Sequence, residues 1–572
     1  MKSPIFQQLV KLAYEANTDM EEWLEGAVQG VQFLERTCAA GDEIILFALG
    51  PHCLVHSVLV PQAAVNPPDH EDISQAHIRS DDTWCIQKIY GGGEGHRIYL
   101  ESPLSSSGSQ TLAGGEKLIF RRHFEGVKSY HPQLEISQKL VHAHELYFMD
   151  ERRAYCRLDA HGDIENVITL HDDEHSDPHQ RVQAVTIRSC DLEVYMALSE
   201  TVLVTQFDFT RFLLGNFSSW DGAKEQIQRD RNLFYRWRVI PNHASYANGH
   251  LLFYTKLSED TLVQEWKAEE NSKTKQYASF KILDRKNKRQ IETSCGPEHI
   301  VNYFTESELP LEISPAFFRP EVLQKYKQDI EKYTISDRSI SCRGAWDLKS
   351  YDINEAGQVH AYIGDLAKLP FEEQLYWKSF NEWPKGNISN RAFQNDILGE
   401  VSTEDNPLAE VRRIVALLNR EAPAWWCPRE DEVIYKVLGC AADSIEEWGN
   451  EILAFDQMVN EGFRAKGLRL IIESLGSSYN QKWRSLKLLE VVVVGSEYTE
   501  DQAKEMIRPL KELHNLRTLI KAHSSPNKRQ LEASKARRTH GTLRDHFQDL
   551  AGQVRDSIKQ VVLILRQSAL KP

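Results

Sequence analysis

The spacing of hydrophobic residues changes along the chain, and this change limits the folds that the chain can adopt. Up to about residue 310, short apolar runs bounded by turn residues are typical of β-strands, as at Ile44–Leu49, Trp84–Tyr90 and Lys117–Phe120. From Asn406 onward, apolar residues recur at intervals of three and four, which is typical of amphipathic helices. The sequence therefore predicts an α+β fold, with a mostly antiparallel, β-rich N-terminal region that also contains helices, followed by an all-α C-terminal domain.

Three regions are expected from this pattern. A chain of 572 residues is longer than one typical domain. We expect an α+β region at residues 1–310, as one domain or two subdomains, which acts in recognition or sensing. A connecting region rich in proline and aromatic residues follows at 311–405, and an all-α domain occupies 406–572.

Within the β-rich region, helices are expected at residues 5–17, 20–36 and about 133–149. The runs Ala154–Leu158 and Ile164–Leu170 predict a β-hairpin, with Gly162 in the turn because glycine tolerates a positive φ angle.

A glycine-rich segment at residues 91–95 invites comparison with a phosphate-binding loop. Such a loop needs a helix directly after it, so that the backbone amides and the helix N-terminus converge on the anion. The continuation His96–Leu100 instead has the pattern of another strand. The segment is therefore interpreted as a hairpin loop.

The C-terminal helices are marked by apolar stripes. One stripe comprises Val411, Ile414, Val415 and Leu418, and a second comprises Ile452, Phe455, Val459 and Phe463. The final helix has the longest stripe, which consists of Leu543, Phe547, Leu550, Val554, Ile558, Val561, Val562 and Leu565. Thr542 and Asp545 form a capping signal in front of it, and the run Leu488–Val494 is expected in the core.

Composition restricts the partners and the location. A net charge of -15 excludes a uniformly basic surface, so any contact with nucleic acid must be local. The nine cysteines contain no C-x-x-C pair, which favours reduced thiols and a cytoplasmic protein. The N-terminus lacks an apolar signal sequence, and no apolar run approaches the ~20 residues that span a bilayer. We therefore expect no membrane partner.

Two clusters in the sequence have both a chemical and a structural interpretation. The segment His171–His179 concentrates imidazole and carboxylate groups, which divalent metals prefer, but its serine and proline are typical of a solvated turn. We expect no metal site and no cofactor. The segment Tyr376–Asn387 alternates aromatic residues with lysines, as a strip for single-stranded nucleic acid would. Burial of its tryptophans in a core is the favoured interpretation.

A chemical signature occurs near the C-terminus. Leu510, Leu513, Leu516 and Ile520 have helical spacing, and the helix is expected to end before Pro526. Arg517 and His523 therefore lie near its end. The residues around and after them form a local polyanion-binding surface, for which we predict RNA contacts by Lys521, Lys528, Arg529, Lys535, Arg537, Arg538, His540, Arg544 and His546.

This arrangement resembles the HEPN superfamily, whose motif is an arginine, four to six residues, and then a histidine. Arg517 and His523 match with five residues between them, and the resemblance covers at most residues 406–570. The family often has Asn, Asp or His directly after the arginine, where this chain has Thr518. The resemblance implies an all-helical domain, RNA as a partner, a homodimer and metal-independent RNA cleavage.

The two residue types suit that chemistry. A histidine can exchange a proton with the 2′-hydroxyl or the leaving oxygen, and His523 would take this role. A forked guanidinium stabilises the charge on the phosphorane, and Arg517 would take that role. On a straight helix, six positions correspond to about 600° of rotation and a rise of ~9 Å, so the side chains point about 120° apart. Either the helix unwinds before His523, or two subunits each contribute one residue.

The sequence thus leads to one main hypothesis and two others. The main one is an intracellular, bacterial-type defence or stress protein, in which a protein or small-molecule trigger acts on the N-terminal region and the helical domain cleaves RNA. His540 and His546 are reserve catalytic candidates. The alternative is a non-catalytic scaffold with a helical dimerisation or docking domain. In the structural interpretation of the motif, His523 is a hydrogen-bonded, partly buried histidine, and Arg517 pairs with Glu512 or another surface acid. A metal-dependent hydrolase in the N-terminal half ranks third.

Overall fold

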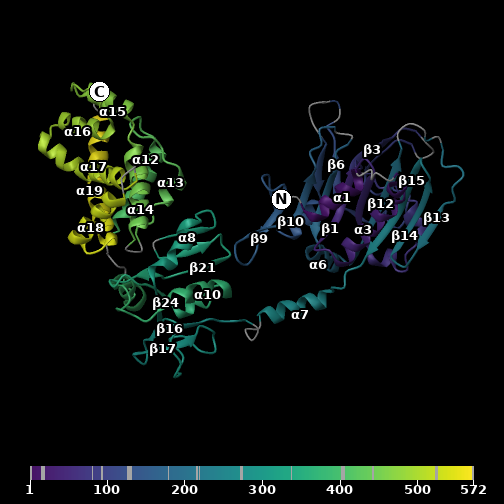
Figure 1. Ribbon diagram of the computed structural model, residues 1–572, viewed down its shortest axis with the longest axis horizontal. Helices are drawn as coiled ribbons and strands as arrows, with labels where there is room; N and C mark the ends of the chain where they lie inside the picture. The colour runs from purple at the N-terminus through teal and green to yellow at the C-terminus, as the bar shows by residue number, and fades with distance from the viewer. Residues whose placement is uncertain are drawn as a thin grey trace. The chain divides into compact units, whose positions relative to one another are not determined.

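The chain divides into two compact units (Figure 1). The computed structural model describes residues 3–14, 20–79, 81–91, 95–124, 126, 132–177, 180–213, 217, 219–270, 275–336, 338–400, 406–440, 444–521 and 526–569. The first unit comprises residues 1–159 and 164–275, and the second comprises 160–163 and 276–572.

An antiparallel sheet of eleven strands forms the centre of the first unit. Its strand order is β13-β14-β15-β12-β2-β1-β11-β10-β9-β8, and β5 pairs with β2 beside this path. The strands are β1 (Glu43–Gly50), β2 (Cys53–Pro61), β5 (Glu116–Lys117), β8 (Tyr147–Met149), β9 (Ala154–Leu158), β10 (Ile164–Asp172), β11 (Gln183–Arg188), β12 (Thr201–Phe212), β13 (Gln226–Arg229), β14 (Leu233–Ile240) and β15 (Ala244–Phe253). Two separate hairpins pair β3 (Cys85–Ile89) with β4 (Arg97–Glu101) and β6 (Ile119–Arg122) with β7 (Gln133–Ile136).

Both faces of this sheet are covered, which explains the continuous apolar sequence of its central strands. In β1, Ile45 contributes to a core with α1 and α3, whereas Ile44 and Leu46 contribute to a core with α5 and α6. A strand that is buried on both sides has no polar alternation. The helices of this unit are α1 (Pro4–Tyr14), α2 (Met20–Glu25), α3 (Ala27–Ala40), α4 (His70–Ser74), α5 (Gln138–Ala143), α6 (Ser189–Ser199) and α7 (Glu259–Glu270), with a short 3-10 turn η1 (Gln62–Val65).

Two of the predicted helices need correction. The helix expected at 20–36 is broken at Gly26, because Arg211 of β12 donates a hydrogen bond to the backbone carbonyl of Trp23 and occupies the space beside Gly26. The helix expected at about 133–149 is helical only in α5. Its first part, Gln133–Ile136, alternates polar and apolar residues with a period of two and pairs with β6. The helix expected at 5–17 is present as α1, and residues 15–19 lie outside the described residues.

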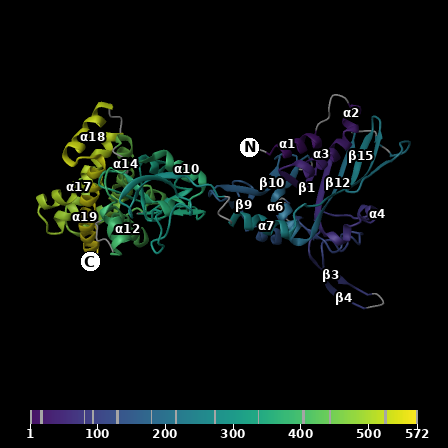
Figure 2. The same cartoon turned by 90° about the horizontal axis from the view of Figure 1, so that it is seen from below.

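The two hairpins predicted from glycine positions are confirmed. Gly162 has a φ angle of 73° between β9 and β10, and Gly91 and Gly95 have φ angles of 71° and 82° between β3 and β4. The strand that follows the glycine-rich segment is inconsistent with a phosphate-binding loop. Figure 2 shows the β3–β4 hairpin extending away from the sheet of its unit.

One face of the β3–β4 hairpin is apolar and exposed. Because neighbouring residues of a strand point to opposite sides, the even-numbered positions share this face. We call it the uncovered face. Its apolar residues are Trp84, Ile86, Tyr90, Ile98 and Leu100, and it also carries the exposed Lys88, which pairs with Ile98.

The second unit begins with a mixed α/β layer at residues 276–400. Its larger sheet has the order β17-β16-β18-β23-β22, with β24 also on β18, and its smaller sheet has the order β19-β20-β21. The strands are β16 (Ser279–Asp284), β17 (Arg289–Ser294), β18 (Pro315–Phe318), β19 (Tyr333–Ile335), β20 (Ile340–Cys342), β21 (Trp346–Leu348), β22 (Asp352–Ile353), β23 (Val359–Tyr362) and β24 (Asn381–Glu382). The helices are α8 (Gln324–Gln328), α9 (Ile363–Leu366), α10 (Phe371–Phe380) and α11 (Asn390–Ala392), with η3 (Pro320–Leu323) before α8 and the π-helix η4 (Phe393–Leu398) after α11.

This layer has its own core, and the aromatic strip of the sequence contributes to it. Trp377 of α10 is fully buried, and its Nε1 donates a hydrogen bond to the hydroxyl of Tyr326 at 2.7 Å. The ring of Trp377 also meets Phe318 edge to face. The expected burial is therefore confirmed for Trp377, but it is wrong for Trp383, which is 41% exposed.

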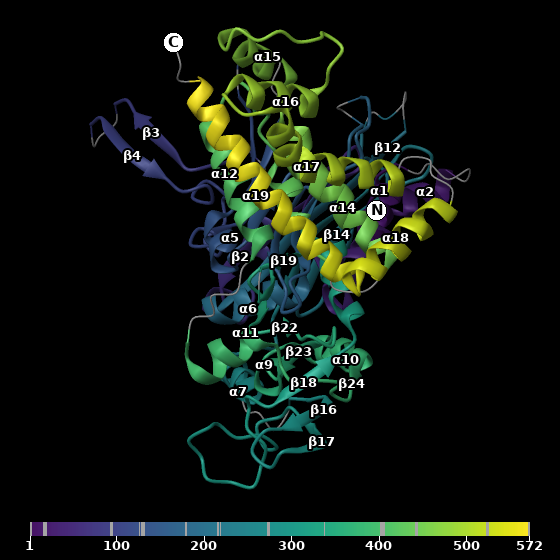
Figure 3. The same ribbon diagram turned by 90° about the vertical axis from the view of Figure 1, so that its left-hand side faces the viewer.

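The helical part of the second unit follows from residue 406 (Figure 3). Its helices are α12 (Pro407–Glu421), α13 (Asp431–Tyr435), α14 (Ile445–Val459), α15 (Ala465–Ser474), α16 (Ser485–Gly495), α17 (Glu500–Lys521), α18 (Pro526–His540) and α19 (Leu543–Ala569), with the 3-10 turn η5 (Asn460–Gly462) after α14. All eight apolar residues of the predicted final stripe are buried, and Thr542 Oγ1 accepts a hydrogen bond from the backbone N–H of Asp545 at 3.0 Å. The predicted α+β fold class is confirmed.

Among the residues that the structure describes, none of the helices is both long and apolar enough to cross a membrane.

The packing of η5 against Trp426 generates a stability prediction. A Cβ atom at Gly462 would lie 2.2 to 2.6 Å from three ring carbons of the buried Trp426. We expect Gly462→Ala to lower the free energy of unfolding by about 2 kcal/mol, because overpacking forces the ring to move. Gly552→Ala in α19 is the matched control, since its Cβ would meet only Pro407 at 3.8 Å, and better helix propensity should stabilise it by about 0.5 kcal/mol. Urea denaturation followed by tryptophan fluorescence measures both, and equal effects would contradict the packing argument.

Candidate functional site

The helix that carries Arg517 packs as its apolar spacing predicts. Leu510, Leu513, Leu516 and Ile520 of α17 are buried in the core of the helical part. A neighbouring strip of the same helix carries His514 and Arg517, and both side chains contact Asp456 of α14. These three residues define the candidate site.

Arg517 is held by two carboxylates through one end of its guanidinium. Its Nη1 lies 2.9 Å from Asp456 Oδ2 and 2.9 Å from Glu461 Oε1. Within the described residues, Nη2 and Nε have no hydrogen-bond partner, and the side chain is 29% exposed. One end of the guanidinium is therefore anchored, and the other is left for a ligand.

His514 is oriented by the same carboxylate. Its Nδ1 lies 3.3 Å from Asp456 Oδ1 and 3.4 Å from Oδ2, and the side chain is 41% exposed. A carboxylate beside Nδ1 favours the tautomer in which Nδ1 carries the proton, so Nε2 is the basic nitrogen. The distances are at the long end for a hydrogen bond.

Asp456 is fixed by burial and by a third donor. It is fully buried, and Asn460 Nδ2 donates to its Oδ1 at 2.7 Å. The same Nδ2 lies 2.9 Å from the backbone carbonyl of Leu510, which joins η5 to α17. A buried carboxylate needs such partners, because an unpaired buried charge is costly.

His514 was missed by the interpretation of the sequence, which considered only a histidine after the arginine. Positions three apart on an α-helix differ by about 60° in direction and ~4.5 Å in height, so His514 and Arg517 are surface neighbours. The available signal was the short pattern His-x-x-Arg on a helix with an apolar face. Arg517 does not pair with Glu512 but with two other acids. One is the buried Asp456, 61 positions earlier, and the other is the partly exposed Glu461, a surface acid of the kind that the alternative expected.

The predicted catalytic partner of Arg517 cannot be placed. His523 lies outside the described residues, as does the side chain of Lys521, the last residue of α17. The pairing of Arg517 with His523 thus stays a prediction.

The predicted basic residues of α18 fall into two groups, one exposed to solvent and one half-buried. Lys528, Lys535 and Arg538 are exposed and lie on one side of the helix, together with Leu531. We call these three cations the α18 basic stripe. Lys535 also forms an ion pair with Glu532 at 2.7 Å. Arg529 and Arg537 are half-buried.

The last three predicted RNA contacts lie around the start of α19. His540 is about one quarter exposed and 3.9 Å from Asp549. Arg544 is half-buried and donates to the backbone carbonyl of Asn354 at 3.2 Å. His546 is buried, and its Nδ1 accepts a hydrogen bond from Trp448 Nε1 at 3.2 Å, while burial lowers its pKa to about 4. His546 therefore belongs to the core of the helical part and is inaccessible to RNA in this conformation.

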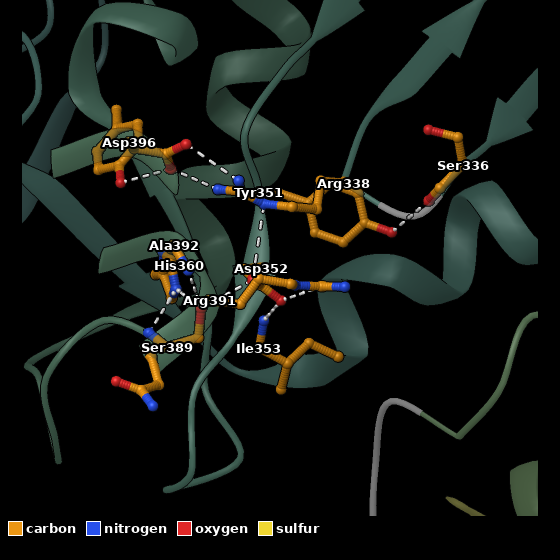
Figure 4. A network of polar contacts seen from close by, with 12 residues as sticks. Ser336, Arg338, Tyr351, Asp352, Ile353, His360, Ser389, Arg391, Ala392 and Asp396 are labelled. Atoms are coloured by element: carbon orange, nitrogen blue, oxygen red, sulfur yellow. Dashed lines mark hydrogen bonds and ion pairs between the residues drawn. The ribbon is translucent and has the colours of Figure 1, made fainter. Parts of the chain in front are cut away.

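A second polar cluster, in the α/β layer, combines the residue types of a hydrolase triad (Figure 4). The hydroxyl of Ser389 donates to Asp352 Oδ2 at 2.7 Å, and the backbone N–H of Ser389 donates to Nε2 of His360 at 3.0 Å. Since Nε2 already accepts this bond and lies 3.4 Å from Ser389 Oγ, it is not placed to take the hydroxyl proton.

The contacts of this cluster are those of a structural network. Ser389 caps α11 by accepting from the N–H of Ala392, and Arg391 binds both oxygens of Asp352 at 2.7 and 3.0 Å. His360 is fully buried. The cluster joins β22, β23 and α11 and offers no reactive nucleophile (Figure 4).

The histidine-rich segment does not form a described metal centre. Its first member, His171, is buried, with Nε2 2.9 Å from Thr186 Oγ1 and its ring stacked on Phe6. Residues 178 and 179 lie outside the described part of the chain. Within that described part, no group of three or more His, Cys, Asp or Glu side chains could hold a metal ion.

Comparisons with known proteins add no relative: no protein family, curated protein or solved structure matches this chain. The arrangement of the site itself is therefore the basis for inferring a function.

The anchored guanidinium generates a second prediction. We expect Arg517→Ala to lower the free energy of unfolding by about 2 kcal/mol, because it removes a charge-assisted bond from the buried Asp456. Arg508→Ala on the same helix removes an exposed pair with Glu505 and should change it by less than about 0.5 kcal/mol. Urea denaturation compares the two, and an equally small effect of both would show that the Asp456 contact does not stabilise the fold.

Proposed function

We propose that the helical part of the second unit cleaves RNA without a metal ion, with Asp456, His514 and Arg517 in its site. One observation carries this proposal. His514 and Arg517 each contact the same buried carboxylate through one nitrogen, which leaves Nε2 of the imidazole and Nη2 and Nε of the guanidinium for a substrate. The resemblance of the segment from Arg517 to His523 to the HEPN motif supports the same reaction.

Each residue has a defined role in the reaction. Nε2 of His514 accepts the proton of the ribose 2′-hydroxyl as its oxygen attacks the adjacent phosphorus. The bond from phosphorus to the 5′-oxygen then breaks, and that oxygen must gain a proton. His523 is the predicted general acid for this step. The products are a 2′,3′-cyclic phosphate and a 5′-hydroxyl end.

Asp456 and Arg517 stabilise the charges that develop. The carboxylate of Asp456 holds the imidazole and stabilises the imidazolium that forms when His514 takes the proton. The free side of the Arg517 guanidinium donates two parallel hydrogen bonds to the equatorial oxygens of the phosphorane. Because Asp456 positions both residues before substrate binds, little reorganisation is needed.

RNA binding, assembly and cellular role complete the proposed function. The α18 basic stripe is the proposed contact for the RNA backbone, which an acidic protein can bind only locally. A homodimer, a cytoplasmic location and a role in bacterial defence or stress are proposed from the HEPN resemblance and the composition. The three described site residues come from one chain, so a dimer would contain two such sites.

Cleavage of labelled RNA by the full-length protein in EDTA tests the proposal. We expect His514→Gln to slow cleavage about 100-fold, because glutamine can occupy the space but cannot accept the proton. Asp456→Asn and Arg517→Lys should each slow it by about 10-fold or more. His523→Ala tests the general acid in the same assay. DNA of the same sequence should stay intact, since it lacks the 2′-hydroxyl.

A histidine outside the candidate site provides the control for the cleavage assay. His299→Gln replaces a histidine of the α/β layer and should cleave at the wild-type rate. Equal rates for His514→Gln and wild type would exclude the proposed base. Cleavage of DNA, or cleavage that EDTA abolishes, would exclude the proposed chemistry. Circular dichroism establishes that each variant is folded at the assay temperature.

RNA binding tests the α18 basic stripe separately from cleavage. We expect the triple variant with Lys528→Glu, Lys535→Glu and Arg538→Glu to bind single-stranded RNA at least about 10-fold more weakly. Its affinity should also depend less steeply on salt, by about 0.7 in slope for each lost phosphate contact. Lys482→Glu, an exposed lysine elsewhere in the helical part, is the control. Fluorescence anisotropy at several salt concentrations measures both, and equal slopes for the triple variant and the wild type would exclude the stripe as the RNA contact.

The second candidate function, a non-catalytic interaction protein, is favoured by a different observation. The uncovered face of the β3–β4 hairpin exposes five large apolar side chains, and contiguous exposed apolar surface is typical of binding sites. Under this alternative, His514→Gln and Arg517→Lys have no effect on function, whereas substitutions on the uncovered face do.

A further inference from the structure

The first unit contains a half-open cavity of about 880 Å³ beside its large sheet. This volume lies within the range of sites for small organic ligands. Strands β5 to β10 and the start of α5 contribute to its lining, as does Trp84 at the base of the β3–β4 hairpin. The aromatic side chains of the lining are Trp84, Phe120, Phe148 and Tyr155. Such a wall suits a flat ring system.

Most charged groups of the lining already have protein partners. Glu116 accepts from Lys139 Nζ at 2.9 Å and from the hydroxyl of Tyr195 at 2.9 Å. Lys117 is buried and donates to the backbone carbonyls of Arg79 and Asp82. These groups build the wall of the cavity and are not available to a ligand.

Arg153 is the exception. Its nearest carboxylate oxygens, in Asp172 and Glu174, lie 3.9 and 3.8 Å away, beyond hydrogen-bond distance. Asp172 is held more closely by Arg181 at 3.2 Å, and the side chain of Glu174 is largely in solvent. The guanidinium of Arg153 thus makes no hydrogen bond to the described residues, and its side chain is 50% exposed. It is a forked cation at the edge of an aromatic cavity.

The backbone at Arg153 adopts a conformation that is costly for a non-glycine residue, as it is at nine other described positions. Its φ angle is 48°, in the left-handed region that favours glycine, in the turn between β8 and β9. A glycine would satisfy this turn better, so the arginine is not explained by local structure. Strained non-glycine positions of this kind are concentrated at functional sites.

Tyr155 supplies a second polar group on the same side. It is the second residue of β9, and both Tyr155 and Arg153 line the cavity. Its ring packs on Phe148 with the centroids 5.0 Å apart. Its hydroxyl makes no hydrogen bond within the described part of the chain, although it lines the cavity. A ligand could accept a hydrogen bond there.

We propose that this cavity binds an aromatic organic anion. The flat part of the ligand packs against Phe120, Phe148 and Tyr155, and its anionic group accepts hydrogen bonds from the Arg153 guanidinium and the Tyr155 hydroxyl. Arginine is suited to this task because its fork matches the two oxygens of a carboxylate, sulfonate or phosphate. This inference is independent of RNA cleavage, since it concerns the first unit. The cavity is then the proposed site for the small-molecule trigger that the sequence led us to expect.

Two fluorescent dyes with the same ring system test this proposal on the full-length protein. Anilinonaphthalene sulfonate is an aromatic anion, and phenylnaphthylamine lacks its sulfonate. We expect saturable binding of the anionic dye, weakened about 10-fold or more by Arg153→Gly and about fivefold by Tyr155→Phe. Both variants should bind the uncharged dye within about twofold of wild type. Arg153→Gly should fold well, because glycine suits a positive φ angle.

Two controls separate the cavity from other surfaces. Arg152→Ala removes the neighbouring arginine, which does not line the cavity, and should leave the binding of both dyes unchanged. The double variant Ile98→Ser and Leu100→Ser removes apolar surface from the exposed hairpin and should also leave both unchanged.

Three results would overturn the proposal: equal effects of Arg152→Ala and Arg153→Gly, loss of dye binding in the hairpin variant, or absence of saturable binding. Because no RNA is present, these results leave the proposed cleavage untouched. Failure of the cleavage assay likewise leaves the cavity untouched.

Discussion

The buried carboxylate of Asp456 is the interaction on which the candidate site depends. A carboxylate without exposure to water must be compensated, and the turn η5 that follows α14 offers Asn460 for this purpose. The remaining compensation comes from α17, through His514 and Arg517. The need to satisfy one charge therefore brings an imidazole and a guanidinium onto neighbouring turns of one helix. The same contact couples stability to the proposed function, since weakening it would loosen both the packing of α17 and the position of the proposed catalytic groups.

Much of the fold could be predicted from local sequence, because local patterns determine it. The apolar stripe of α19, its capping by Thr542 and the glycine turn at Gly162 depend on residues that are close in the sequence. The failures had tertiary causes. The helix at 20–36 is broken by Arg211, a residue of a distant strand. The segment Gln133–Ile136 is a strand because β6 is available to pair with it.

The candidate site was predicted only in part, for the same reason. Arg517 was identified because it stands out beside a histidine and a basic segment in an acidic chain. His514 was not, because its importance comes from Asp456, which no local pattern connects to it. Similarly, Ser389, His360 and Asp352 are unremarkable in the sequence and look like a hydrolase triad in space, yet their hydrogen-bond directions show that they stabilise the layer. The residue types in a cluster are thus a weaker guide to its function than the directions of its hydrogen bonds.

The β3–β4 hairpin has a further consequence for the behaviour of the molecule. Two strands have only each other as partners, so the outer edge of each strand keeps amide and carbonyl groups that no neighbouring strand satisfies. A ribbon of this kind is marginal in water. A strand that pairs with an outer edge, or a lipid-like additive that covers the apolar side chains, would lower the free energy of the hairpin. The conformation of this exposed hairpin therefore depends on its surroundings more than that of the eleven-stranded sheet does.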